Sequence, residues 1–240
     1  MTSLRKTALV AGVFYLVTFI SIPTLALYGP VKTQTDYITS SGADTGALWG
    51  GLLEVIVALA GIGTAVTLYP VVKRQNQGLA LGFVATRTLE AAMIFAGVAS
   101  ILSLVAMRQA GASGAEATSL TTVGETLVAF YNGTFLLGQS LMPVANALLL
   151  GTLLYQSRLV PRVIPLLGLV GAPLQLTAVI LTMFGVVDRV SSVTGLLVIP
   201  DVLWELSLGL YLVIKGFKPS PVTAGMVEPS TPRAYREAAV

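Results

Sequence analysis

Six long apolar stretches constrain this chain more than any other feature of its sequence. A helix needs about 20 mainly apolar residues to cross the hydrocarbon core of a bilayer, which is about 30 Å thick. Six segments meet this requirement, at about residues 7–27, 47–72, 79–107, 127–156, 163–187 and 192–214. Because lipid offers the backbone no hydrogen-bond partners, each stretch must be helical. The sequence therefore predicts an all-α polytopic membrane protein, a bundle of six transmembrane helices.

The composition agrees with this class and narrows the chemistry. Only 10% of the residues are charged, whereas soluble domains carry about 25%. The chain contains no Cys and no His, which excludes thiol nucleophiles, imidazole ligands and a Ser-His-Asp triad. We therefore expect no catalytic residues, no metal site and no cofactor. The net charge of +3 does not indicate nucleic acid, because the basic residues flank the spans; the expected partner is the lipid bilayer.

The distribution of basic residues predicts the orientation. With the N-terminus inside, ten Lys and Arg lie on the inner side, and Lys32, Arg108 and Arg189 lie on the outer side. The inner group is Arg5, Lys6, Lys73, Arg74, Arg158, Arg162, Lys215, Lys218, Arg233 and Arg236. By the positive-inside rule both termini are cytoplasmic. The first stretch is longer than the apolar core of a signal peptide and lacks an Ala-x-Ala site, so we expect it to stay as a span.

The spans define one membrane domain, residues 1–218, and a tail, residues 219–240. Two connections, residues 28–46 and 108–126, are predicted as longer polar loops. The tail is rich in Pro, Ser and Thr and cannot bury enough apolar surface to offset its ordering entropy. We expect it to be a disordered cytoplasmic tail.

Five ionisable residues fall inside predicted spans, where each costs about 2.5–3.5 kcal/mol at the bilayer centre. Arg87 and Glu90 are three residues apart and Asp201 and Glu205 are four apart, so each pair shares a helix face. Glu54 is the fifth. Four carboxylates outnumber one guanidinium, and Arg87 can pair with only one or two of them. The surplus must be protonated, reach water or meet a cation.

This arrangement leaves three hypotheses. In the first, the cluster of Arg87, Glu90, Asp201, Glu205 and Glu54 binds or transports a small solute, a proton or a cation. In the second, the cluster is a structural clamp in an interaction or scaffold subunit that binds a membrane protein partner. The third and least favoured is an intramembrane enzyme that uses Asp201 and Glu205 as acid and base.

A polar stripe marks the fourth span. Glu125, Asn132, Gln139 and Asn146 recur every seven residues and therefore fall on one slowly drifting helix face. The stripe predicts either the polar wall of a cavity or hydrogen bonds between helices. Two further residues are candidates for the same interior: Gln175 in the fifth span, and Trp204, which stands near the middle of the sixth.

Three stretches carry a resemblance to a known family: Arg5–Leu16, Arg87–Ala91, and Pro200–Leu206 with its continuation Leu212–Phe217. In these the chain resembles the bacterial six-span membrane proteins grouped as domain of unknown function 4386. The resemblance extends over nearly the whole chain up to Pro219. It implies six helices in a bacterial cytoplasmic membrane and implies no activity.

Overall fold

The computed structural model describes residues 2–33, 37–40, 43–111 and 115–226. The described residues form helices and turns, with no strand among them. The elements are α1 (Ser3–Thr18), η1 (Phe19–Ser21), α2 (Thr24–Leu27), α3 (Gly29–Thr33), α4 (Thr45–Val72), α5 (Gln77–Ala110), α6 (Ala115–Phe135), η2 (Leu136–Leu141), α7 (Met142–Ser157), α8 (Val163–Met183), α9 (Ser192–Ile214) and η3 (Pro221–Met226). Of these, η2 is a π-helical turn between α6 and α7.

The prediction of six membrane-spanning helices is confirmed. Six helical segments are long and apolar enough to cross a bilayer: Ser3–Ser21, Thr45–Val72, Gln77–Ala110, Ser119–Ser157, Val163–Met183 and Ser192–Ile214. Their outward faces are apolar, and large side chains such as Leu59, Val66 and Leu196 are more than half exposed. Exposed apolar surface on this scale suits a protein whose solvent is lipid.

Several predicted boundaries differ from the structure, most of all the end of the first span and the connection between the third and fourth spans. The first span ends at Ser21 rather than near residue 27, because Pro23 cannot donate a backbone hydrogen bond and a short separate helix, α2, follows it. The expected polar loop over residues 108–126 is also largely helical. There α5 continues to Ala110 and α6 begins at Ala115, so the two helices form a long hairpin.

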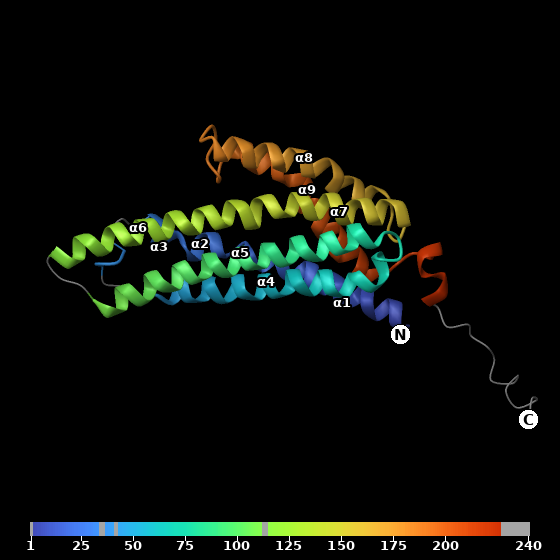
Figure 1. Cartoon of the computed structure of the whole chain (residues 1–240), viewed down its shortest axis with the longest axis horizontal. Helices are drawn as coiled ribbons and strands as arrows, with labels where there is room; N and C mark the ends of the chain where they lie inside the picture. Colours follow the sequence, from blue (N-terminus) through green and yellow to red (C-terminus); the bar gives the residue numbers. More distant parts are fainter. Residues whose placement is uncertain (1, 34–36, 41–42, 112–114, 227–240) are drawn as a thin grey trace, which may run out of the picture.

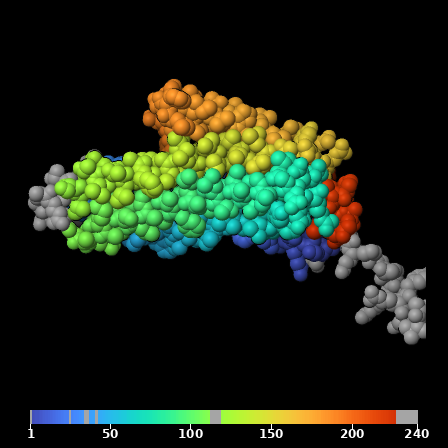
Figure 2. All heavy atoms as spheres, viewed as in Figure 1, coloured from blue at the N-terminus to red at the C-terminus, as the bar shows by residue number. Residues whose placement is uncertain are grey.

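The bundle has two distinct ends (Figure 1). The N-terminus and the connections after α4 and α7 lie at one end, which we call the basic end because it carries Arg5, Lys73, Arg74, Arg158 and Arg162. The far ends of α5 and α6 form the opposite end, the hairpin end. With 34 residues, α5 is about 51 Å long, well beyond the thickness of the hydrocarbon core. Figure 2 shows the consequence on the surface: the green α5–α6 ends extend past the orange end of α8.

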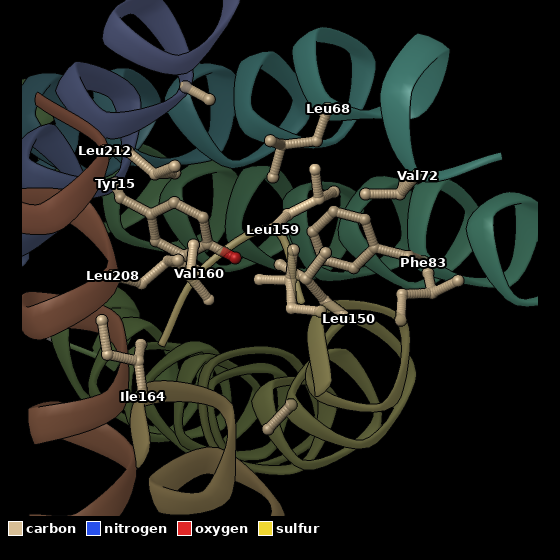
Figure 3. Close-up of a cluster of buried hydrophobic side chains, with 14 of the residues drawn as sticks. Tyr15, Leu68, Val72, Phe83, Leu150, Leu159, Val160, Ile164, Leu208 and Leu212 are labelled. Atoms are coloured by element: carbon tan, nitrogen blue, oxygen red, sulfur yellow. The ribbon is translucent and has the colours of Figure 1, made fainter. Parts of the chain in front are cut away.

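Each end has its own apolar core. Near the basic end, α1, α4, α5, α7, α8 and α9 bury Tyr15, Phe83, Trp204 and a set of Leu and Val side chains. Figure 3 shows the Tyr15 ring beside Leu208 and Leu212 in this core. At the hairpin end, Tyr28 and Val31 of the α2–α3 region pack with Ile101 of α5 and Tyr131 of α6.

The segment that follows α9 stays packed on the basic end. The Lys218 backbone N–H donates to the Leu159 carbonyl at 2.8 Å, and the Ser220 hydroxyl donates to the Ser157 carbonyl at 2.6 Å. The side chain of Thr223 in η3 is buried. The beginning of the predicted disordered tail, up to Met226, is therefore ordered by bonds to carbonyls at the end of α7 and just beyond it. Residues 227–240 lie outside the described residues, and the expectation for them stays a prediction.

Candidate functional site

A buried ion-pair network joins α5 to α9. Arg87 Nη1 lies 3.0 Å from Glu90 Oε2, one turn along α5, and Arg87 Nη2 lies 2.6 Å from Glu205 Oε1 of α9. The Arg87 guanidinium also lies over the rings of Tyr15 and Phe83, at 5.4 and 5.9 Å from their centroids. Both aromatic faces and both carboxylates favour the cation. We call Arg87, Glu90, Asp201 and Glu205 the Arg87 cluster.

A third helix completes the network. The Asn146 side chain of α7 donates to Glu90 Oε2 at 2.7 Å, and the Thr86 hydroxyl donates to Asn146 Oδ1 at 2.6 Å. The amide is thereby fixed in one orientation, with its NH₂ toward Glu90 and its oxygen toward Thr86. The Arg87 cluster thus connects α5, α7 and α9.

Asp201 is the exception within the cluster. It lies one turn before Glu205 on α9 and only 5% of its surface is exposed, yet no described residue forms a hydrogen bond or an ion pair with it. Its Oδ1 is fully buried without a partner, as are Arg87 Nε and Gln175 Oε1 nearby. An unpaired buried carboxylate costs several kcal/mol when charged. Asp201 therefore requires a proton, a positively charged partner or water in the cavity that it lines.

All four cluster residues line one cavity of about 200 Å³. Gln139 of η2, Gln175 of α8, Thr18 of α1 and Ser21 of η1 line it as well, so its polar side chains come from six segments of the chain. Apolar side chains, including Val57, Ile94 and Val198, form the remaining wall. A cavity that mixes convergent polar groups with apolar walls is the usual form of a small-molecule site.

Irregular helix geometry positions these groups. Pro143 cannot donate to the Gln139 carbonyl, and the chain widens into the π-turn η2 immediately before it. The Gln175 amide of α8 donates to the Ser140 carbonyl of this turn at 2.9 Å. On α9, Pro200 precedes Asp201, and Gly171 of α8 lets the two backbones meet, since a Cβ there would lie 2.8 Å from the Asp201 nitrogen.

Glu54 lies in a separate network. Its carboxylate is fully buried and accepts hydrogen bonds from the hydroxyls of Tyr131 (2.8 Å) and Tyr28 (3.3 Å) and from the Gln139 amide (3.2 Å). We call these four residues the Glu54 network. It lies toward the hairpin end, and Gln139 is the one residue that both belongs to it and lines the cavity.

The other residues that the sequence suggested for the interior of the bundle lie in several different places. Along the polar stripe, Asn146 binds Glu90 and Gln139 lines the cavity, whereas Asn132 and Glu125 are exposed and line a pocket beside Lys32. Trp204 does not line the cavity. It packs on Gly168 of α8, where a Cβ would lie only 2.7 Å from the indole ring.

Three tyrosines were not among the sequence candidates although they serve both networks. Tyr28 and Tyr131 are the principal donors to Glu54, and Tyr15 lies under Arg87. A tyrosine near the end of a predicted span is usually interpreted as a residue at the membrane–water interface, so Tyr28 and Tyr131 did not stand out as members of a buried network.

The helices and the buried cluster together define a multi-pass helical membrane protein with an ionic site inside the bundle. Residues 10–216 match the family described as Domain of unknown function (DUF4386), and the chain belongs to that family. This confirms the resemblance seen in the sequence. No curated protein and no solved structure matches the chain.

Proposed function

We propose that this chain binds a small solute or cation in the cavity of the Arg87 cluster, and that binding serves its transport. The observation that carries the proposal is Asp201, a buried carboxylate without a partner on the wall of a polar cavity. In a purely structural network an unpaired buried carboxylate would only destabilise the fold, because no partner compensates its charge. Buried ionisable groups in membrane helices characteristically serve ion and substrate pathways.

The charge of the site favours a cationic ligand. Glu90, Asp201 and Glu205 face a single guanidinium, and Arg87 already pairs with two of the three carboxylates. A bound proton or the ammonium group of a small solute would compensate Asp201. Gln139 and Gln175 offer neutral donors and acceptors to the rest of such a solute.

Native mass spectrometry of gently extracted protein tests the proposal. The wild type should retain a bound non-lipid molecule that disappears in Asp201→Asn and in Glu205→Gln. Asp188→Asn is the matched control, because it removes the same charge from an exposed position outside the cavity. Retention of the molecule by Asp201→Asn would refute a role for Asp201 in binding.

The second candidate function is a scaffold subunit in which the cluster acts only as a clamp. It is favoured by the bonds through which Arg87 and Asn146 tie α5, α7 and α9 together. The two candidates differ at Asp201, which takes no part in the clamp. A stoichiometric protein partner retained in mild detergent by both the wild type and Asp201→Asn, without a bound solute, would favour the scaffold.

We further propose that the basic end faces the cytoplasm of a bacterial cell, with both termini inside. The basic residues at that end support this orientation through the positive-inside rule. Because the chain lacks Cys, single cysteines report the topology directly. In intact cells an impermeant maleimide should label Val186→Cys at the hairpin end and leave Gln77→Cys unlabelled until the membrane is opened.

A further inference from the structure

Two cations toward the hairpin end, Lys32 and Arg189, have no counter-ion among the described residues. No carboxylate oxygen in the described part of the chain lies within 4 Å of the Lys32 ammonium or the Arg189 guanidinium. Arg189 Nη1 is buried and has no hydrogen-bond partner. Arg108 at the same end is different, because it binds Asp44 at 2.7 Å and lies over the Tyr37 ring.

The two cations converge on one face of α6. Lys32 Nζ lies 5.1 Å from the centroid of Tyr131, and the Arg189 guanidinium lies 4.1 Å from that of Phe135. Tyr131 and Phe135 are four residues apart and therefore neighbours on the helix surface. Burial and the charge of Arg189 lower the pKa of Lys32 to about 8, which is consistent with two like charges held close together.

A pocket of about 430 Å³ lies between these cations. Asn132 and Thr182 add an amide and a hydroxyl to its wall, and Leu136 and Val190 line its apolar side. Of the described carboxylates, Glu54 accepts hydrogen bonds from three neutral donors, and Glu125 lines an adjoining pocket beside Lys32 without pairing with it. Asp188, next to Arg189 in the chain, is exposed and forms no ion pair among the described residues. Ammonium, guanidinium, amide and hydroxyl donors around one space form a typical environment for a phosphate or carboxylate group.

The basic pocket opens into an apolar cleft. Leu136, Thr182, Arg189 and Val190 line both spaces, and the cleft continues for about 300 Å³ between η2 and the helices α8 and α9. Its walls include Phe135, Ala178, Val179 and Val198. In Figure 1, α8 and α9 diverge from α6 toward the hairpin end, where this cleft lies. A charged pocket that leads into an apolar groove matches an amphiphile rather than a free ion.

We propose that this site binds an anionic lipid, with its phosphate between Lys32 and Arg189 and an acyl chain in the cleft along η2. The charge complementarity and the unpartnered Arg189 Nη1 select an anionic headgroup over a zwitterionic one. None of the four cluster residues lines either space, although Gln139, Gln175 and Val198 line both the cleft and the cavity of the Arg87 cluster, so the two sites adjoin. The proposal rests on Lys32 and Arg189 and does not require a ligand at the Arg87 cluster.

The test is native mass spectrometry of the full chain with equal amounts of phosphatidylglycerol and phosphatidylcholine that carry the same acyl chains. The wild type should retain phosphatidylglycerol preferentially. Arg189→Gln and Lys32→Gln should each reduce that preference about fivefold. Arg108→Gln is the matched control, because it removes one charge at the same end and should leave the preference unchanged. Arg189→Lys, which keeps the charge, guards against effects of misfolding and should retain most of the preference.

A second arm separates a lipid from a free anion. Gly195 lines the cleft, and a Cβ there meets no atom within 4 Å, so Gly195→Leu fills the apolar space without removing a charge. This variant should lose phosphatidylglycerol, and inorganic phosphate at the same concentration should not displace the lipid from the wild type. Equal retention of both lipids, an equal loss in Arg108→Gln, or binding of phosphate that Gly195→Leu leaves intact would each overturn the proposal.

Discussion

The Arg87 cluster and the Glu54 network bury glutamates in two different ways. Glu90 and Glu205 are held by a cation, whereas Glu54 is held by two hydroxyls and an amide that carry no charge. In the network both carboxylate oxygens of Glu54 accept hydrogen bonds. In the cluster Asp201 remains unpaired, so its charge is surplus to the packing. The difference indicates that Glu54 joins α4 to neighbouring segments, while the unpaired carboxylate of Asp201 in the cluster is available to bind a ligand.

Removal of the central cation should have the largest effect. Arg87→Met leaves Glu90 and Glu205 buried without their partner, and the free energy of unfolding should fall by about 3–5 kcal/mol. Denaturant titration in detergent measures it, with Arg74→Met on the exposed turn after α4 as the control. The double variant with Glu205→Gln should recover part of the loss. A change below about 1 kcal/mol would show that the carboxylates do not depend on Arg87.

Neutralisation of the second glutamate should cost less. In Glu54→Gln the amide oxygen can still accept from Tyr131 and Gln139, and the new NH₂ can donate to the Tyr28 hydroxyl. We expect a loss of about 1 kcal/mol, similar to that of Tyr131→Phe, in the same denaturant titration. If Glu54→Gln proved as costly as Arg87→Met, the two regions would not differ in the way argued here.

The two acidic residues of α9 should separate stability from binding. Asp201→Asn removes an unpaired charge and should change the free energy of unfolding by no more than about 0.5 kcal/mol, or raise it. Glu205→Gln weakens the bond to Arg87 and should cost about 1.5–3 kcal/mol. Both should lose the bound solute. A large loss of stability in Asp201→Asn would make this residue part of the clamp.

The sequence predicted the transmembrane helices more accurately than the contacts between them and the segments that connect them. A run of about 20 apolar residues has one outcome in lipid, so the six helices followed from the local pattern alone. The depth of Arg87, Glu90, Asp201, Glu205 and Glu54 within their spans likewise marked them as a group, and the structure brings the first four of these to one cavity. A local sequence pattern does not show which helices contact one another or through which residues.

Glu54 illustrates that limit. The sequence placed it about two turns below the outer end of its span, and its partners come from the α2–α3 region, from α6 and from η2, far away in the sequence. The spacing of seven along the fourth span grouped Asn146 and Gln139 with Asn132 and Glu125. In the structure the first two lie at the Arg87 cluster or its cavity, and the other two are exposed. The spacing gave no sign of the π-turn η2, which arises where Pro143 removes a backbone donor. The relation of Lys32 to Arg189 depends on the same long-range packing.

A pH-dependent effect should come from Lys32, whose ammonium lies over the Tyr131 ring of the Glu54 network. The pKa of Lys32, about 8, lies below the ordinary value of 10.5, so between these values the folded protein holds fewer protons than the unfolded chain. Over that window its contribution to stability rises with pH, while its attraction for an anionic headgroup is lost as pH passes about 8. Retention of phosphatidylglycerol should therefore fall up to about fivefold between about pH 7 and pH 9.

A matched pair of variants makes this pH response specific. Lys32→Gln should abolish it, because the guanidinium of Arg189 keeps its charge over this range. In Glu54→Gln the fall should occur at lower pH, because the charge of Glu54 is what raises the pKa of Lys32 against burial and Arg189. A pH response that persists in Lys32→Gln would assign the titration to another group and would disconnect the Glu54 network from the lipid site.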